Sequence, residues 1–453
     1  MPSPSPSPPN LRDPRGHGLG TVVAEAAERV EAALWRMMSC AESPWGDLQA
    51  AAEADPRWAL PLVMQAGHLL GQGDAAACAP ARELLARAAA LTLGAPARER
   101  AHWSAVNTAA EGHWQEACAA WDELLLTHPR DALALHWAHH WSLTIGDTAS
   151  LRWRPARVLP EWDETDQLFP QVLGLYAFGL QENNLYPQAE DAGRRATASE
   201  ASVPWAVHAV AHVMDRQGRI EEGTAWLRLH QPAWSDSNAF AGHLWWHMAL
   251  FRLEALDLPG VHRLIDAHFS QTSGTNAADH IDTVSLLWRL HLMNEDVSAR
   301  FREVLKVWQP AVEEAGHLAF HDLHWLLALL GAGELARAEA WIARCASRAM
   351  QADEARRSNH RTAREVGLPL MRGLLAGARG DETQALTLIQ AVRPQWGRLG
   401  GCQVQRDLLD QTLLAAAATQ AAPIGRALLN ERLMSKPATP LTRHWAERLQ
   451  LAL

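Results

Sequence analysis

Residues 205–223, WAVHAVAHVMDRQGRIEEG, contain the pattern that decides the fold of this chain. A helical stretch stops at Gly218-Arg219, and a second helical stretch follows with a small residue, Gly223, five positions after the break. A small side chain is favoured at that position because the second helix packs closely on the first. The pattern therefore predicts a helix-turn-helix unit.

The same break recurs along the chain. Subtracting the first positions of successive breaks gives steps of 39, 34, 38, 34, 38, 38, 39 and 47 residues, which are typical of helix-turn-helix repeats with periods of about 34 to about 47. The breaks lie at Gly73-Asp74, Gly112-His113, Gly146-Asp147, Asn184-Leu185, Gly218-Arg219, Leu256-Asp257, Asn294-Glu295, Gly333-Glu334 and Gly380-Asp381. The small residue five positions later recurs as Ala117, Ala189, Gly223, Ala338 and Ala385.

Strand signals are sparse, whereas Ala, Leu, Glu, Gln and Arg recur at helical spacing. We therefore predict an all-α protein, a right-handed superhelical solenoid of helix-turn-helix repeats of the tetratricopeptide (TPR) type. The first helix of each repeat is expected to line the inner face, and stability is expected from contacts between neighbouring repeats. Residues 21–453 are predicted to form this single domain. Residues 1–20 begin with alternating Pro and Ser and are predicted to be a disordered tail.

Composition excludes several classes of protein. Hydrophobic residues make up 48% of the chain and charged residues 20%, which excludes global disorder. The formal net charge of -10 argues against a nucleic-acid-binding protein. No stretch approaches the roughly 20 apolar residues of a membrane span. The five cysteines are scattered and never form a CxxC motif, so we expect reduced thiols in a cytoplasmic protein.

Several longer stretches carry a family resemblance. They are residues 176–184, 205–219, 243–251, 282–289 and 366–369, and together they resemble the tetratricopeptide repeat protein 38 family. The resemblance covers most of residues 21–453 and implies an all-helical TPR-like protein, but no settled biochemical activity. The chain departs from the family at His321, where Asn is usual, and at Cys402-Gln403, where a Ser-His pair is usual.

Histidines are the strongest candidates for chemistry. Four pairs are spaced one helical turn apart: His136/His140, His208/His212, His243/His247 and His317/His321. His208/His212 and His243/His247 are 35 residues apart, which is one repeat, and both pairs precede their turns. They are therefore expected on the first helices of adjacent repeats, facing the same concave surface.

Three interpretations of these histidines stay open, of which the third is direct contact with a binding partner. In the first, His208, His212, His243 and His247 bind a divalent transition metal, because imidazoles one turn apart can chelate one ion. Asp282 would then orient a histidine, and His324 with Asp322 would act as a general base in a metal-dependent, hydrolase-like enzyme. In the second, the imidazoles form hydrogen bonds within the structure. P-loop, nucleophile-elbow and zincin motifs are absent from the sequence.

Tryptophans and arginines near the histidines suggest a binding surface. Trp205, Trp246 and Trp288 are either core residues or an aromatic wall for a ligand. Arg289 and Arg406 could anchor a carboxylate, although Arg289 could instead form an ion pair with Asp282. The repeat architecture favours a module whose concave face binds a peptide or protein segment or a small molecule. The alternative is the metal-dependent enzyme.

Overall fold

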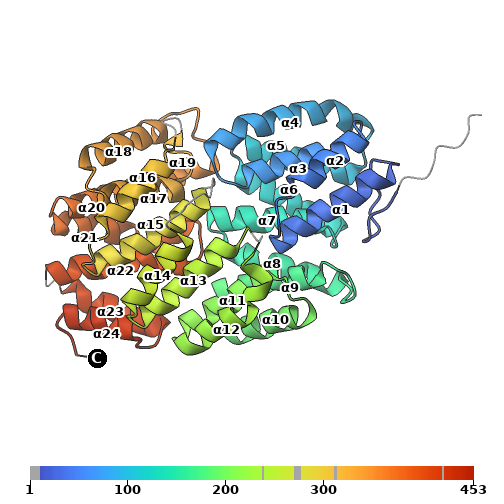
Figure 1. The fold of residues 1–453 in the computed structure, drawn as a ribbon. Coiled ribbons are helices and arrows are strands. Elements are labelled where there is room, and N and C mark those ends of the chain that lie inside the picture. The colour runs from blue at the N-terminus through green and yellow to red at the C-terminus, as the bar shows by residue number, and fades with distance from the viewer. Residues whose placement is uncertain (1–10, 237–238, 270–276, 311–313, 421–422, 453) are drawn as a thin grey trace, which may run out of the picture.

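The fold consists of helices joined by short turns, as a computed structural model shows (Figure 1). The structure describes residues 11–236, 239–269, 277–310, 314–420 and 423–452. Within these ranges the only β pairing is an isolated antiparallel bridge between Arg12 and Gly18. The predicted all-α class is therefore confirmed. None of the described helices is long and apolar enough to cross a membrane.

Most helices form pairs. The first helices of the pairs are α3 (Leu60–Leu70), α5 (Ala97–Ala110), α7 (Ala132–Ile145), α9 (Phe169–Glu182), α11 (Pro204–Arg216), α13 (Ala241–Glu254), α15 (Ala277–Leu292), α17 (Ala319–Gly331), α20 (Leu368–Ala378) and α22 (Gln403–Thr419). The second helices are α4 (Cys78–Leu91), α6 (Trp114–Thr127), α8 (Thr148–Val158), α10 (Tyr186–Ser199), α12 (Ile220–Trp234), α14 (Leu258–His268), α16 (Ser298–Val307), α18 (Leu335–Ala349), α21 (Glu382–Val392) and α23 (Ile424–Ser435). Four further helices are α1 (Ala24–Ser39), α2 (Trp45–Ala54), α19 (Ser358–Thr362) and α24 (Pro440–Arg448). Short 3-10 turns are η1 (Ala75–Ala77), η2 (Thr92–Gly94), η3 (Leu159–Glu161) and η6 (Arg393–Leu399), and η5 (Ala363–Gly367) is a π turn.

A residue in the left-handed backbone conformation lies at every predicted break between paired helices. Such a residue turns the backbone out of the helix and lets the next helix start within a few residues. Glycine has no Cβ to oppose this conformation, and asparagine tolerates it better than most residues. The φ values are +75° at Gly73, +86° at Gly112, +73° at Gly146, +61° at Asn184, +68° at Gly218, +59° at Leu256, +67° at Asn294, +80° at Gly333 and +83° at Gly380.

Close packing explains the small residue that follows each of five breaks. Ala117, Ala189 and Ala338 are completely buried. At Gly223, a Cβ atom would lie 2.1 Å from the ring of Phe251 on the first helix of the next pair. Close packing at these positions is therefore confirmed, but at Gly223 the close neighbour is the first helix of the next pair and not, as predicted, the first helix of the same unit.

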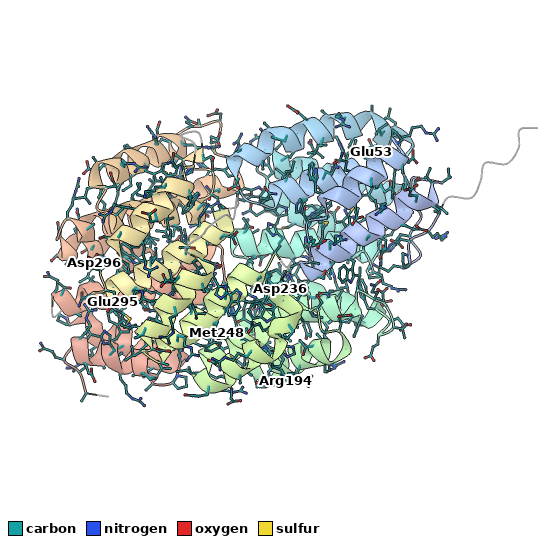
Figure 2. All side chains as sticks on the ribbon, viewed as in Figure 1. Glu53, Arg194, Asp236, Met248, Glu295 and Asp296 are labelled. Carbon is teal, nitrogen blue, oxygen red and sulfur yellow. The ribbon has the colours of Figure 1, made fainter. Side chains whose placement is uncertain are left out.

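The C-terminal helices pack against the middle of the stack. Helix α22 contacts α15, α24 contacts α13, and η6 contacts α7. One cluster of buried apolar side chains includes residues from Leu19 to Ala446, and Figure 2 shows side chains filling the spaces between the helices. Our expectation that only neighbouring repeats stabilise one another is therefore wrong, because segments far apart in sequence share this core.

Buried charges accompany this closure. The Lys436 ammonium, after α23, lies 3.0 Å from Asp215 Oδ1 at the end of α11 and 2.5 Å from Glu254 Oε1 at the end of α13. Thr439 also donates to Glu254 at 2.7 Å. All four residues are buried. Buried charges are costly unless they are paired, so this network requires the C-terminal helices to stay in contact with α11 and α13.

Residues 11–20 correct the predicted extent of the disordered tail. Arg15 is buried and donates to Glu31 Oε1 at 2.7 Å, Leu19 is buried, and the backbone N–H of Gly20 donates to Glu99 Oε1 at 2.8 Å. These ten residues therefore pack against the helices, because an ion pair, an apolar side chain and a backbone bond hold them there. Residues 1–10 lie outside the described part of the chain.

Replacing Lys436 with Met should destabilise the protein strongly. The change leaves the buried carboxylates of Asp215 and Glu254 without their ammonium partner, which should lower the free energy of unfolding by about 3–5 kcal/mol. Urea unfolding followed by circular dichroism measures this change. The control is Lys306→Met, because Lys306 pairs only with exposed Glu303 in the described structure and should change the free energy by less than about 0.5 kcal/mol. Equal effects of the two substitutions would contradict the importance of the buried network.

Candidate functional site

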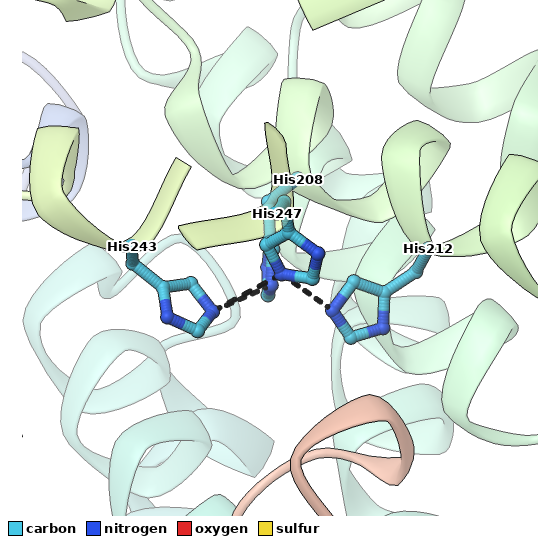
Figure 3. Close-up of side chains that lie close together, drawn as sticks. All are labelled: His208, His212, His243 and His247. Carbon is cyan, nitrogen blue, oxygen red and sulfur yellow. Dashed lines mark hydrogen bonds between the residues drawn. The ribbon is translucent and has the colours of Figure 1, made fainter. Parts of the chain in front are cut away.

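Two adjacent first helices carry the predicted histidines. Pro204 occupies the first position of α11, where its missing N–H leaves no hydrogen bond unmade, and α11 presents His208 and His212 one turn apart. Helix α13 presents His243 and His247 in the same way. The 35-residue spacing places the two helices side by side, so that all four rings meet (Figure 3). The expected convergence of the two pairs is confirmed.

The four Nε2 atoms form a compact group, which we call the histidine cluster (His208, His212, His243 and His247). Nε2 of His243 lies 3.0 Å from that of His208 and 3.3 Å from that of His247. Nε2 of His247 lies 3.2 Å from that of His212. One ring nitrogen from each residue lies within 4.8 Å of all the others.

Carboxylates lie behind two of the imidazoles. Asp282 on α15 is 2.7 Å from Nδ1 of His243, and because a carboxylate accepts, this contact places a proton on Nδ1. Glu182, at the end of α9, lies 3.8 Å from Nδ1 of His212. A carboxylate that is hydrogen-bonded to a metal-binding histidine, as Asp282 is to His243, orients the ring and increases its basicity.

Aromatic rings hold the imidazoles in place. Phe178 on α9 stacks on His208 with ring centroids 5.2 Å apart and planes at 18°, and Trp246 stacks on His243 at 5.2 Å and 15°. The indole of Trp246 donates to Ser285 Oγ at 2.9 Å, which fixes its orientation. The side chain of His243 is 15% exposed, whereas the other three histidines are buried.

Burial lowers the pKa of three histidines of the cluster. It holds the pKa of His208, His212 and His247 well below the usual range, and the neighbouring imidazoles lower these pKa values further. Neutral imidazole is the form that binds a metal. These three imidazoles are therefore uncharged near neutral pH, and each has one ring nitrogen that can bind a metal.

The spacing fits a tetrahedral ion. An ion about 2.0–2.1 Å from four nitrogens in tetrahedral geometry separates those nitrogens by about 3.3 Å. Three of the six separations, the Nε2–Nε2 distances of 3.0–3.3 Å, are close to that value, and all six are within 4.8 Å. Four imidazole nitrogens, with a carboxylate hydrogen-bonded to one of the rings, suit Zn²⁺ and other divalent transition metals better than Ca²⁺ or Mg²⁺, which prefer oxygen.

Asp322 and His324 do not form the expected general base. His324 is buried, and its Nδ1 donates to the carbonyl oxygen of Phe320 at 2.8 Å. Asp322 instead accepts from the backbone N–H of Gly316 at 2.9 Å and lies beside Cys345. Two residues that are two positions apart on a helix point about 200° apart, so these side chains face different surroundings. Their predicted cooperation is therefore wrong.

The predicted ligand anchors are already used inside the protein. Arg289 is buried and donates to the carbonyl oxygens of Ser285, Val404 and Gln405, rather than to Asp282 or to an open surface. Arg406 donates to Gly400, Gly401 and Glu182. Both assignments need correction, because residues 400–405 cover the inner face where the arginines lie.

The three tryptophans also pack within the structure. The buried indole of Trp288 donates to Thr412 Oγ1 at 3.0 Å, and Trp246 supports His243 as described above. Trp205 is half-buried, and its ring lies 5.1 Å from that of Phe240 and 5.8 Å from that of His208. The core interpretation therefore holds for Trp246 and Trp288, while Trp205 lies at the edge of the cluster.

Sequence reasoning missed Glu182 and Phe178. Both lie on α9, the first helix of the preceding pair, and Glu182 occupies the position just before the turn at Asn184. Its carboxylate also accepts from the backbone N–H of Gln403 at 3.0 Å. A comparison of the same helix face in successive repeats would have identified these residues, because inner-face positions recur with the repeat period.

Comparisons with known proteins support no finer assignment. No protein-family model matches the chain. The chain is similar to a crystal structure of a tetratricopeptide repeat protein from Parabacteroides merdae, with 11% sequence identity, a TM-score of 0.34, and coverage of 66% of this chain and 99% of that chain. The TPR-like description of this chain rests on its own turns and packing, and membership of the tetratricopeptide repeat protein 38 family stays a prediction.

The environment of Asp322 should make stability depend on pH. Burial raises the pKa of its carboxyl from 3.8 to about 7, so the folded protein holds this proton over a range where the unfolded chain has lost it. The contribution of Asp322 to the free energy of unfolding should therefore be largest below about pH 4. It should fall as pH rises toward 7, by about 4 kcal/mol at most.

Asp322→Asn removes this dependence while keeping the oxygen that accepts from Gly316. Unfolding in urea at pH 5 and pH 7.5 should show a smaller difference for the variant than for the wild type. The control is Asp236→Asn, since Asp236 is exposed. An identical pH dependence in the wild type and Asp322→Asn would refute the assignment.

Proposed function

We propose that this protein is a metal-binding helical-repeat protein that holds one divalent transition metal ion, most naturally Zn²⁺, on the histidine cluster. The observation that carries the proposal is the convergence of four imidazole nitrogens within 4.8 Å. The burial and lowered pKa of His208, His212 and His247, and the carboxylate of Asp282 behind His243, support it.

A metal at this point would join two repeats. His208 and His212 belong to α11, and His243 and His247 belong to α13, so the ligands come in equal number from two first helices. Four protein ligands are typical of a structural tetrahedral site. Such a site contributes its binding free energy directly to folding, because the unfolded chain does not preform it.

Metal content gives the direct test. The purified protein is stripped of metal with a chelator and reloaded with Zn²⁺, after which it should hold about one ion per chain. The double variant His212→Gln/His247→Gln should hold less than about 0.1 equivalent. Free Zn²⁺ at one hundred times its dissociation constant should stabilise the wild type by about 2.7 kcal/mol. Elemental analysis and thermal unfolding measure the two effects.

His262→Gln provides the matched control, because His262 lies on α14 and pairs with Glu295 rather than with the cluster. Co²⁺ loading provides a second readout, since a tetrahedral site gives intense visible absorption. Less than about 0.1 equivalent of metal in the reloaded wild type, or unchanged metal in the double variant, would overturn the proposal.

Hydrolytic chemistry is the second candidate, and one observation favours it. His243 is the partly exposed member of the cluster. If a substrate or water took its place, three buried imidazoles would hold the metal, which is the arrangement of catalytic zinc sites. The metal would then supply Lewis-acid chemistry.

Release of p-nitrophenolate from p-nitrophenyl acetate tests this candidate. Zinc-loaded wild type should hydrolyse the ester, and His212→Gln should lose that activity by about 100-fold because the metal is held less tightly. The His262→Gln control should retain it. Equal rates for wild type and His212→Gln would reject hydrolysis while leaving metal binding intact.

Binding of a peptide or protein segment on the inner face, which the repeat architecture suggests, is supported less well. Around Arg289 and Trp288 that face is covered by residues 404–412 of the same chain. A partner would have to bind elsewhere or displace these residues.

A further inference from the structure

A cavity lies between the N-terminal helices and the segment from α17 to α19. It has a volume of about 470 Å³ and is lined on one side by the turns after α3 and α5 and by α7, and on the other by α17, α18 and residues 357–360. Figure 1 shows α19 beside the N-terminal helices. We call this space the closure cavity. Its volume is within the range of small-molecule sites, about 300–1,000 Å³.

Hydrogen bonds across this junction fix the walls of the cavity. The backbone N–H of Ser358 donates to the carbonyl oxygen of Gly112 at 2.9 Å, and its hydroxyl accepts from the backbone N–H of Trp114 at 2.7 Å. Gly73 has no side chain, and a Cβ there would lie 2.8 Å from the ring of His321. The cavity is therefore built from segments that are more than 200 residues apart in sequence.

The lining of the cavity is positively charged, although the chain is acidic. Arg82, Arg348 and Arg357 line it together with one carboxylate, Glu354, which gives three positive charges against one negative charge. Glu354 lies 3.1 Å from Arg357 and 3.6 Å from Arg348. The whole chain has a formal net charge of -10, so this local excess favours an anion.

The three guanidinium groups converge on one region. Burial is the main cause that lowers the pKa of His317 to about 4, and the nearby charges of Arg348, Arg357 and Arg82 contribute to the same shift. His317 is therefore neutral at pH 7 and can form hydrogen bonds without adding charge. His360 is buried, lines the cavity, and has an Nε2 atom with no hydrogen-bond partner in the described structure.

Aromatic rings form another part of the wall. Trp114 and Trp141 are stacked, with centroids 5.2 Å apart and planes at 23°, and the ring of His317 meets Trp114 edge-on at 6.2 Å. Aromatic walls with a few charged groups are typical of sites for planar ligands.

We propose that the closure cavity binds a planar organic anion, whose carboxylate or phosphate pairs with Arg82, Arg348 and Arg357 and whose ring lies against Trp114 and Trp141. Guanidinium groups suit both anions because they present paired N–H donors in one plane. The proposal does not depend on the histidine cluster, since the two sites share no residue.

Isothermal titration calorimetry with three probes tests the proposal. 2-Naphthoate and 2-naphthyl phosphate should bind one molecule per chain, and neutral 2-naphthamide should bind at least about tenfold more weakly, because it cannot form the charge-assisted bonds. The tighter of the two anions identifies the charged group that the site prefers. Equal binding of the amide and both anions, or no binding of any probe at millimolar concentration, would overturn the proposal.

Two variants locate the binding. Arg82→Gln and Arg357→Gln should each weaken the tighter anion by about tenfold and leave 2-naphthamide unchanged. Arg344→Gln is the matched control, because Arg344 lies on α18 with Arg348 but is exposed and does not line the cavity. Thermal unfolding of each variant checks that it folds. Undiminished anion binding by both cavity variants, or the same loss in Arg344→Gln, would place any binding elsewhere and refute this site.

Discussion

The guanidinium of Arg289 on α15 donates to the backbone carbonyl oxygens of Val404 and Gln405, at 2.8 and 3.4 Å, in the first turn of α22. A buried guanidinium needs such partners, because leaving it without hydrogen bonds would cost several kcal/mol. The bond keeps α22 against the inner face of the stack. From there Gln403 reaches Glu182, and Glu182 faces His212. The closing contact and the histidine cluster are thus parts of one connected region.

Closure distinguishes this protein from an open repeat groove. In an open solenoid the inner surfaces of the first helices face solvent or a partner. Here the chain's own C-terminal residues cover part of that surface, and Lys436 holds them through buried carboxylates on α11 and α13. The closure cavity lies apart from this covered surface, between the N-terminal helices and the segment from α17 to α19, and Arg82, Arg348 and Arg357 line it.

Buried histidines occur in two places that differ in the charges around them. In the histidine cluster, burial and mutual proximity lower the pKa of His208, His212 and His247, and one nitrogen of each of the four rings lies near a common centre. In the closure cavity, burial and nearby guanidinium groups keep His317 neutral beside a positive wall. The same residue type thus suits a cation in one place and an anion in the other, because the surrounding charges differ.

Local sequence signals determined the helices, the nine left-handed turns and the 35-residue spacing that brings two histidine pairs together, since these features depend on contacts within about one repeat. They also placed Asp282 on the next first helix, although its contact with His243 needed the structure. Only the tertiary structure decided that Arg289, Arg406 and Trp288 serve the interior, and that Asp322 and His324 face apart. The reason is distance along the chain: the contacts of Arg289 with Val404 and of Glu182 with Gln403 join residues 115 and 221 positions apart, and no local pattern encodes such a closure.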